Sequence, residues 1–481
     1  MDAHLLGLLG PYNPWFGQGD AALGDTPEFH RPVFDELLRD LAQIQQILSI
    51  TGPRRIGKTT LLRQIVRHFL RTGTKAESLI YYSFDDPALL RPRFDKHAFF
   101  DSLMREASRT AQGGQKALVL LDEIQRLESW ELYLKKYYDL DYPIRFVVSG
   151  SASSPIFKKS RESLLGRVKD FHLLPFSFRE FLLKRSMSEP DLVAELDALR
   201  DAGIQIMGML AGDPRHFDLQ QVPVPKPSDH LWAQAQLAFA DYLRDGGFPE
   251  VWAMESWENK VEYLYDNQVK KVIFEDLVLA AEFRKPEQLK RFYISLLERP
   301  GREVNFTKLN EETAIATSQV DKYVALLELT DLLTHIGKFR KSPLRVRRGS
   351  VKFYLVDLAL RNAVLRLENV TTDPDTLGLY AENLVFNALR KSKGTIAIDY
   401  YREKRHEVDF VVHFGPRKYL PVEVKYRDTI SNTDIAGAQF FQKRFRSIQP
   451  IVVTKTQADF GQVSGTNVFR MPLMQFLLVF D

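Results

Sequence analysis

The stretch from Gly52 to Thr60, Gly-Pro-Arg-Arg-Ile-Gly-Lys-Thr-Thr, constrains the fold more than any other part of the chain. It follows the apolar run 46–50, a predicted strand, and precedes residues 61–66, a predicted helix. A glycine-rich turn between strand and helix directs backbone N–H groups and the positive end of the helix dipole toward a bound polyphosphate. We expect Lys58 to reach the β- and γ-phosphates of ATP and the Thr59 hydroxyl to ligate Mg²⁺. The predicted nucleotide-binding residues are Gly52, Pro53, Arg54, Arg55, Ile56, Gly57, Lys58, Thr59 and Thr60.

Composition limits the kind of protein that surrounds this loop. The 481 residues suffice for about three domains, and 44% hydrophobic and 27% charged residues are typical of a soluble globular chain. The absence of cysteine excludes a disulfide framework and thiolate zinc sites, and it suits a reducing compartment. Residues 1–24 lack the features of a secretory signal, and no apolar run reaches about 18 residues. We therefore expect a cytoplasmic protein with no membrane partner. The net charge of +4 is too small to indicate nucleic-acid binding over the whole surface, so any such site is local.

Strand and helix patterns alternate through the first part of the chain. An amphipathic helical pattern covers 31–49 and leads into the strand before the loop. Further strands are predicted at 78–84, 116–121 and 145–149, and a helix at 94–112. The run 116–121 is continuously apolar, as in a strand buried on both faces of a parallel sheet. This order predicts a three-layer α/β domain that binds nucleotide at the carboxyl ends of its strands.

Two acids close the buried strand at 116–121. Asp122 is placed to hold Mg²⁺ through its water shell, and Glu123 to orient and deprotonate an attacking water. The pair predicts ATP hydrolysis, although two acids capping a helix N-terminus would look the same in sequence. Ser149 ends the next strand, where its hydroxyl would either hydrogen-bond the γ-phosphate or stabilise a turn.

Several segments together resemble landmarks of prokaryotic AAA-type ATPases, in which the ATPase is fused to a C-terminal region of uncertain function with a nuclease-like fold. The segments are Arg54-Arg55, 121–125, 149–151, 164–167, 175–181 and 246–250. The resemblance implies ATP and Mg²⁺ as cofactors. It also implies that Arg167 contacts nucleotide phosphates, either within one subunit or across an interface between self-associated subunits. The alternative for Arg167 is a basic residue at the end of a glycine-capped helix.

The segment that follows is predicted to form a helical lid and a connector. Residues 181–210 have a helical pattern, 213–229 collect prolines without a period, and 231–245 resume a helix. The turn that starts at Gly246-Gly247 is interpreted as a helix stop without chemistry.

From residue 286 the pattern changes to short helices followed by two strands, which predicts a winged helix. The predicted helices are 288–298, 306–313 and one capped by Ser318, and the predicted strands are 332–339 and 352–356. Every charged residue from Lys338 to Lys352 is basic, so the hairpin can follow a DNA backbone while the third helix enters a major groove. A packing module with a solvated basic loop is the alternative.

The last part of the chain places carboxylates on apolar elements. A polar stretch with Pro374, 369–378, is predicted as a linker. Glu382 then shares an apolar helical stripe with Val385, Phe386 and Leu389, and a charged residue is unusual in such a stripe.

Three strands are predicted next, at 395–401, 407–414 and 419–426. In the second, the apolar residues alternate on one face and leave Asp409 on the other. In the third, Glu423 and Lys425 share the polar face. If the apolar faces join one core, Asp409, Glu423 and Lys425 converge. Two carboxylates and a lysine suit phosphodiester hydrolysis with Mg²⁺ or Mn²⁺ held by the acids.

The order Glu382, Asp409, Glu423-Val-Lys425 resembles the PD-(D/E)XK nuclease superfamily and, in its arrangement, the archaeal Holliday-junction resolvases. The resemblance implies that Glu382, Asp409 and Glu423 hold a metal ion and that Asp409, Glu423 and Lys425 are catalytic. It also implies DNA, including branched DNA, as substrate, and a polar role for Gln439 on a helix at 433–445. Residues 433–434 and the tail after residue 455 have no counterpart in that family. An inactive domain that keeps the fold is the alternative.

These observations predict four domains: a P-loop ATPase core at 1–180, a helical lid and connector at 181–284, a winged helix at 285–370 and an α/β restriction-endonuclease-like domain at 371–481. We expect a Mg²⁺-dependent ATPase whose nucleotide state positions the two C-terminal domains on DNA, with metal-dependent DNA cleavage as a second activity. One alternative is a nucleotide-gated switch whose inactive nuclease-like domain binds a protein. Another is a DNA-binding transcription factor with an ATPase regulator.

Overall fold

The computed structural model describes residues 3–111, 115–151, 163–211, 219–222, 224–278, 285–305, 309–311, 315–340, 350–392 and 394–480. The chain divides into two compact units. The N-terminal unit comprises Met1–Leu174 and Phe274–Arg284, and the C-terminal unit comprises Pro175–Ile273 and Lys285–Asp481. The last three of the four predicted domains thus lie almost entirely in one unit. Among the helices that the structure describes, none has the length and apolar character required to cross a bilayer.

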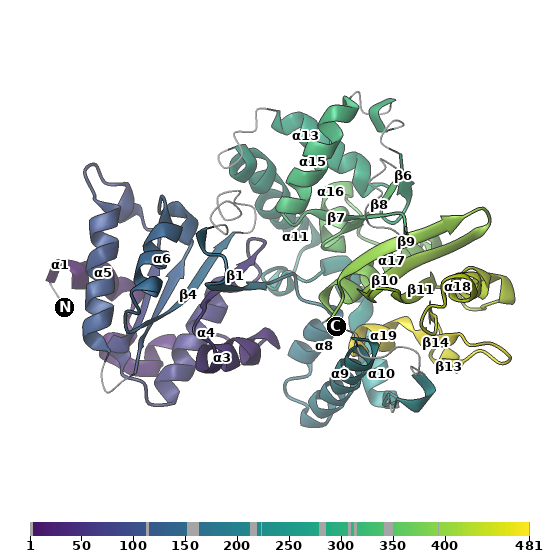
Figure 1. Ribbon diagram of the computed structural model, residues 1–481, viewed down its shortest axis with the longest axis horizontal. Helices are drawn as coiled ribbons and strands as arrows, with labels where there is room; N and C mark the ends of the chain where they lie inside the picture. The colour runs from purple at the N-terminus through teal and green to yellow at the C-terminus, as the bar shows by residue number, and fades with distance from the viewer. Residues whose placement is uncertain are drawn as a thin grey trace. The chain divides into compact units, whose positions relative to one another are not determined.

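A five-stranded sheet forms the centre of the N-terminal unit. Its strands are β1 (Ile47–Gly52), β2 (Leu79–Ser83), β3 (Ala117–Asp122), β4 (Ile144–Ser151) and β5 (Val168–His172). They pair in the order β2-β3-β4-β1-β5, and every pair is parallel. The predicted parallel α/β sheet is therefore confirmed. Because β4 lies between β1 and β3, the carboxyl ends of these three strands meet at one edge (Figure 1).

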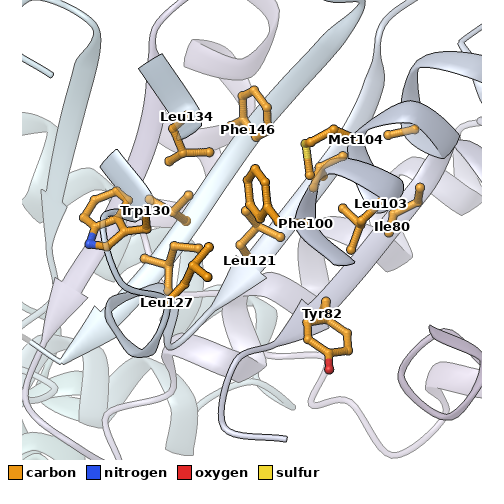
Figure 2. Close-up of a cluster of buried hydrophobic side chains, with 14 of the residues drawn as sticks. Ile80, Tyr82, Phe100, Leu103, Met104, Leu121, Leu127, Trp130, Leu134 and Phe146 are labelled. Carbon is orange, nitrogen blue, oxygen red and sulfur yellow. The ribbon is translucent and has the colours of Figure 1, made fainter. Parts of the chain in front are cut away.

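Helices cover both faces of this sheet (Figure 1). They are α3 (Val33–Gln43), α4 (Lys58–Arg71), α5 (Lys96–Thr110) and α6 (Trp130–Asp139), preceded by the short helices α1 (Ala3–Leu9) and α2 (Trp15–Gln18). Figure 2 shows the core between α5, α6 and the sheet, where Phe100 lies close to Leu121 of β3 and Phe146 of β4. The helix predicted at 31–49 is shorter than expected, because it ends at Gln43 before β1 begins.

The N-terminal residues complete the edge strand β2, a role that no sequence pattern indicated. The Asn13 amide donates to Tyr81 O at 2.8 Å and accepts from Tyr81 N at 2.7 Å. The Trp15 indole donates to Leu79 O at 2.9 Å. These side chains satisfy backbone groups that an edge strand would otherwise leave unpaired.

The C-terminal unit starts with helices. They are α8 (Phe178–Arg185), α9 (Pro190–Ala211), α10 (Asp229–Asp245) and α11 (Trp257–Leu264), followed by a π-helical segment at Tyr265–Lys270. A second π-helical segment, Val272–Asp276, begins in this unit and ends in residues that belong to the N-terminal unit. The helical pattern predicted at 181–210 is confirmed except between α8 and α9, where the chain leaves the helix at Ser186 and restarts at Pro190. Residues 212–218 of the predicted connector lie outside the described residues.

A three-stranded antiparallel sheet follows, in the order β6-β8-β7. Its strands are β6 (Glu303–Val304), β7 (Leu333–Gly337) and β8 (Val351–Leu355), and the helices of this segment are α13 (Pro286–Leu297) and α15 (Thr317–Leu329). The N-cap predicted at Ser318 is wrong, because α15 begins at Thr317 and Ala316 is its cap. The basic hairpin residues 341–349 and most of the predicted helix 306–313 lie outside the described residues, so the winged helix stays a prediction.

The rest of the C-terminal unit is built on a six-stranded sheet in the order β13-β14-β12-β11-β10-β9. Its strands are β9 (Ala397–Glu403), β10 (His406–Gly415), β11 (Lys418–Lys425), β12 (Ile451–Thr454), β13 (Gly461–Gln462) and β14 (Phe469–Pro472). The helices are α16 (Leu358–Leu365), α17 (Pro374–Lys391), α18 (Asn432–Phe445) and α19 (Leu473–Val479). Strands β9, β10 and β11 are antiparallel, whereas β11, β12 and β14 are parallel.

The linker predicted at 369–378 is wrong in its second half. Pro374 is the first residue of α17, and the Asp373 carboxylate accepts hydrogen bonds from the N–H groups of Asp375 and Thr376. Proline suits the first position of a helix, where its missing N–H has no intrahelical partner. The proline interpreted as a loop signal is therefore a helix start.

The simple alternation predicted for β10 is also wrong. The register changes from Val408 opposite Tyr401 to Val411 opposite Asp399, so β10 has one residue more than β9 in between. Val408 and Val411 therefore pack in the same hydrophobic cluster. Phe410 instead lies near the Phe386 ring of α17, with centroids 6.0 Å apart. Asp409 lies within this bulge.

Candidate functional site

The glycine-rich loop between β1 and α4 has the backbone of a phosphate-binding turn. Gly52 has φ +144°, and a Cβ there would lie 2.1 Å from Leu173 O. Gly57 has φ +93° and is the N-cap of α4. Both positions therefore require glycine. The buried Lys58 ammonium donates to Gly52 O at 3.0 Å and to Pro53 O at 2.7 Å, which places it beneath the loop.

The Asp122 carboxylate connects the loop to two neighbouring strands. Its Oδ2 accepts from Thr59 Oγ1 at 2.6 Å and from Tyr81 OH at 3.0 Å. Its Oδ1 accepts from the Ser149 hydroxyl. Ser149 is fully buried inside β4, so the interpretation as a simple turn serine is wrong. The structure thus brings Thr59, Asp122 and Ser149 together, and their oxygen atoms fit an Mg²⁺–nucleotide pair at this edge of the sheet.

Glu123 follows Asp122 in a left-handed backbone conformation, with φ +50°. Gln125 Nε2 donates to Glu123 Oε2 at 2.6 Å and fixes the carboxylate. Burial raises the pKa of Glu123; the positive charge of Lys58 opposes this shift, and the negative charge of Asp122 adds to it. A carboxylate with a raised pKa next to a phosphate-binding loop is suited to accept a proton from water.

Two arginines of the predicted site have partners in the N-terminal unit. Arg54 Nε donates to Asp276 Oδ2 at 2.8 Å, and this hydrogen bond raises the pKa of Arg54. Arg167 Nε donates to Asp139 Oδ1 at 2.6 Å. The Arg167 carbonyl accepts from Ile47 N, at the amino end of β1. Because β1 has 6 residues and rises about 3.3 Å per residue, Arg167 lies about 16 Å from the loop that follows this strand. The structure does not bring Arg167 to the phosphate loop of its own chain.

The predicted C-terminal acids converge in the C-terminal unit. Glu382 of α17, Asp409 of β10, and Glu423 and Lys425 of β11 line one pocket of about 560 Å³. Lys425 Nζ contacts Glu423 Oε1. Asp409 Oδ2 accepts from Val424 N at 3.0 Å, and Glu423 Oε2 accepts from Asp409 N at 3.2 Å. These backbone hydrogen bonds hold the Asp409 and Glu423 carboxylates on adjacent strands.

A second lysine lies among these acids. Lys352 Nζ of β8 is 3.2 Å from Glu382 Oε1, 3.2 Å from Asp409 Oδ1 and 3.4 Å from Glu407 Oε1. Its side chain is only 5% exposed. Tyr354 OH, also of β8, donates to Glu382 Oε1 at 2.7 Å. Lys352 was predicted only as part of the basic hairpin.

The acids differ in how readily they ionise. Burial, together with the negative charge of Asp409, raises the pKa of Glu423 and of Glu382. Burial acts in the same direction on Asp409, but the positive charges of Lys352 and Lys425 outweigh it and lower the pKa of Asp409. Asp409 is therefore the acid that carries the negative charge of the cluster most firmly.

The cluster as it stands does not fit a divalent metal ion. Across the described residues, no three His, Asp or Glu side chains are arranged to hold one. The reason is visible in the geometry, since the Lys352 ammonium is within 3.2 Å of oxygen atoms from both Glu382 and Asp409. The helix α18 also differs from expectation, because Thr433, Asp434 and Gly437 line the pocket and Gln439 does not.

Comparison with known proteins agrees with the first of these two sites. Residues 44–182 match the family described as AAA domain. The N-terminal unit carries an AAA-type ATPase domain. Residues 236–371 and 377–474 match two families described as domains of unknown function, DUF8612 and DUF4143. The AAA domain thus contains Lys58, Thr59, Asp122 and Glu123. The match at residues 236–371 includes Lys352.

Similar chains align with this one over most of their length. An uncharacterized protein of Methanocaldococcus jannaschii is 24% identical over 446 residues, which cover 90% of this chain and 85% of the relative. An uncharacterized protein of Haemophilus influenzae is 22% identical over 414 residues, covering 83% and 88%. Among solved structures, a DNA replication initiation factor is 12% identical and covers 55% of this chain and 92% of its own, with a TM-score of 0.24. That score is too low to support a conclusion.

Proposed function

We propose that this protein is a Mg²⁺-dependent ATP hydrolase in which Lys58, Thr59, Asp122 and Glu123 act together. The hydrogen bond of 2.6 Å between Thr59 Oγ1 and Asp122 Oδ2 carries this proposal, because it brings the two predicted Mg²⁺ ligands to one point beside the loop. The ion, when bound with ATP, neutralises charge on the phosphates. Lys58 binds the β- and γ-phosphates, Ser149 orients Asp122, and Glu123 accepts the proton of the attacking water.

Two substitutions separate binding from turnover. Lys58→Ala should abolish nucleotide binding or hydrolysis, whereas Glu123→Gln should bind ATP and lose turnover, because only the proton acceptor is removed. Binding is measured with a fluorescent ATP analogue and hydrolysis by phosphate release. Asp409→Ala, in the other unit, serves as the control and should hydrolyse ATP at the wild-type rate. Wild-type turnover in Lys58→Ala would refute the assignment.

We also propose that the pocket of the C-terminal unit binds DNA. Three exposed arginines, Arg302, Arg402 and Arg405, line it together with the acid cluster. Exposed guanidinium groups can form bidentate hydrogen bonds with phosphodiester oxygens. The convergence of Glu382, Asp409, Glu423 and Lys425 favours the nuclease resemblance, whereas Lys352 among the acids favours the inactive, nuclease-like alternative.

Labelled linear, forked and four-way DNA would test this candidate, each with and without ATP and divalent metal. We expect salt-sensitive binding that Arg405→Ala weakens and the matched surface change Arg446→Ala, outside the pocket, does not. Cutting by the wild type but not by Asp409→Ala would identify a nuclease. Binding that is absent or insensitive to salt would instead favour the nucleotide-gated switch. Sequence-specific footprints that survive in Asp409→Ala would favour the transcription factor.

A further inference from the structure

The surroundings of Lys352 differ from those of an ordinary surface lysine. Its strand β8 is buried at every position, and its ammonium is in contact with acids from two elements, α17 and β10. The Tyr400 ring lies 5.7 Å from Nζ and adds a favourable aromatic face. A buried ammonium is stable only when carboxylates surround it, as they do here.

The strand that carries Lys352 is fixed to the helix that carries Glu382. Asn383 of α17 accepts from Leu355 N at 2.8 Å and donates to Leu355 O at 2.9 Å. Gly301 leaves space beside the same acid, because a Cβ at this position would lie 3.0 Å from Glu382 Oε1. Lys352 therefore extends toward the acids from a strand that is hydrogen-bonded to α17, and rotation of the lysine side chain would withdraw the ammonium.

We propose that the Lys352 ammonium is the built-in counter-cation of the C-terminal acid cluster and that a divalent ion can bind between Glu382 and Asp409 only after Lys352 withdraws. A single positive charge between the two carboxylates reduces their mutual repulsion, which a divalent ion would otherwise relieve. The acid cluster therefore has a positive counter-charge in place without a metal ion. This inference is independent of ATP hydrolysis, which belongs to the other unit.

The test measures Mn²⁺ binding to the full-length chain without nucleotide, by the electron paramagnetic resonance signal of free Mn²⁺. Lys352→Met keeps most of the side-chain volume and removes the charge. We expect Lys352→Met to bind Mn²⁺ about tenfold or more tightly than the wild type. The additional substitution Asp409→Asn should abolish this gain, because it removes one of the two carboxylates. An unchanged rate of ATP hydrolysis reports that the AAA domain is intact in every variant.

Two controls separate displacement from a general effect of charge. Lys425→Met removes the neighbouring lysine, which contacts Glu423 and does not bridge Glu382 and Asp409. Lys404→Met removes an exposed lysine outside the pocket. Only Lys352→Met should show the full gain. Equal Mn²⁺ affinity in the wild type and Lys352→Met, or an equal gain in Lys425→Met, would overturn the proposal.

A measurement on the wild type makes the proposal testable even if Lys352→Met does not fold. An amine-acetylating reagent, read out by mass spectrometry without metal, should modify Lys352 at least about tenfold more slowly than Lys404, because Lys352 is buried in ion pairs. Acetylation of both lysines at the same rate would show that Lys352 is not held in the cluster and would refute the inference.

Discussion

The environment of Glu123, the proposed general base, predicts how ATP hydrolysis depends on pH. A general base acts only in its ionised form, and burial raises the pKa of Glu123 above the ordinary glutamate value of 4.5. Glu123 is protonated below its pKa, so ATP turnover should fall as the pH drops through a value higher than 4.5. The measurement is the rate of ATP hydrolysis against pH at saturating ATP. Gln125→Ala removes the hydrogen bond that stabilises the ionised form and should move the acid limb to still higher pH. An acid limb at or below 4.5 would contradict this role.

At individual positions, motif spacing predicted some contacts and missed others. Asp122 and Thr59 could be predicted because a phosphate-binding loop and the end of a buried strand have a fixed relation in a parallel sheet. Lys352 could not, because its partners Glu382 and Asp409 are far away in sequence. The one signal was a lysine in a run that is otherwise apolar or aromatic from Val351 to Val356.

Asp357 joins two elements of the C-terminal unit through backbone groups. Its Oδ1 accepts from Ala359 N at 2.8 Å and caps α16, and its Oδ2 accepts from Gly247 N at 2.7 Å at the turn after α10. Asp357→Ala should lower the free energy of unfolding by about 2–4 kcal/mol, because it loses a cap and leaves a buried N–H group unpaired. Chemical denaturation measures this change. Asp373→Ala, which removes the exposed cap of α17, should have a smaller effect; equal losses would contradict the contribution of the Gly247 contact.

The same carboxylate carries a pH dependence. Burial raises the pKa of Asp357 to about 6, above the ordinary 3.8. The folded state therefore binds this proton more tightly than the unfolded state, and the stabilisation is complete below about pH 4. It is lost as the pH rises from about 4 through about 6. In Asp357→Asn this part of the pH dependence of stability should be absent.

For whole elements, sequence periodicity predicted the strands whose positions depend on local sequence. It did not predict features that depend on pairing with a distant strand. The strands β2, β3 and β4 were predicted within a few residues, because each has a run of apolar residues at its centre, and β3 is buried at every position, as in a strand covered on both faces. The bulge in β10 was not, because it depends on the pairing of Val408 and Val411 with a particular partner strand. Pro374 was misassigned, because proline occurs both in loops and at the first position of helices.

For the molecule as a whole, the position of Arg167 bears on self-association. It lies at the amino end of the sheet of the AAA domain and pairs with Asp139, whereas the phosphate loop lies at the carboxyl end. If Arg167 contributes to ATP hydrolysis, it does so on a nucleotide held by another copy of the chain. An arginine in that role contributes a factor of about 10³ to 10⁵ to turnover.

Complementation between two inactive chains measures this directly. Arg167→Ala and Lys58→Ala should each be inactive alone. Their mixture should regain ATP hydrolysis, because an intact phosphate loop of one chain can meet an intact Arg167 of the other. The turnover of the wild type should also rise with protein concentration. Arg109→Ala, which breaks an exposed pair with Glu106 in the same unit, is the matched control and should stay active. A wild-type rate in Arg167→Ala would leave Arg167 as a surface partner of Asp139, and an inactive mixture would confine catalysis to single chains.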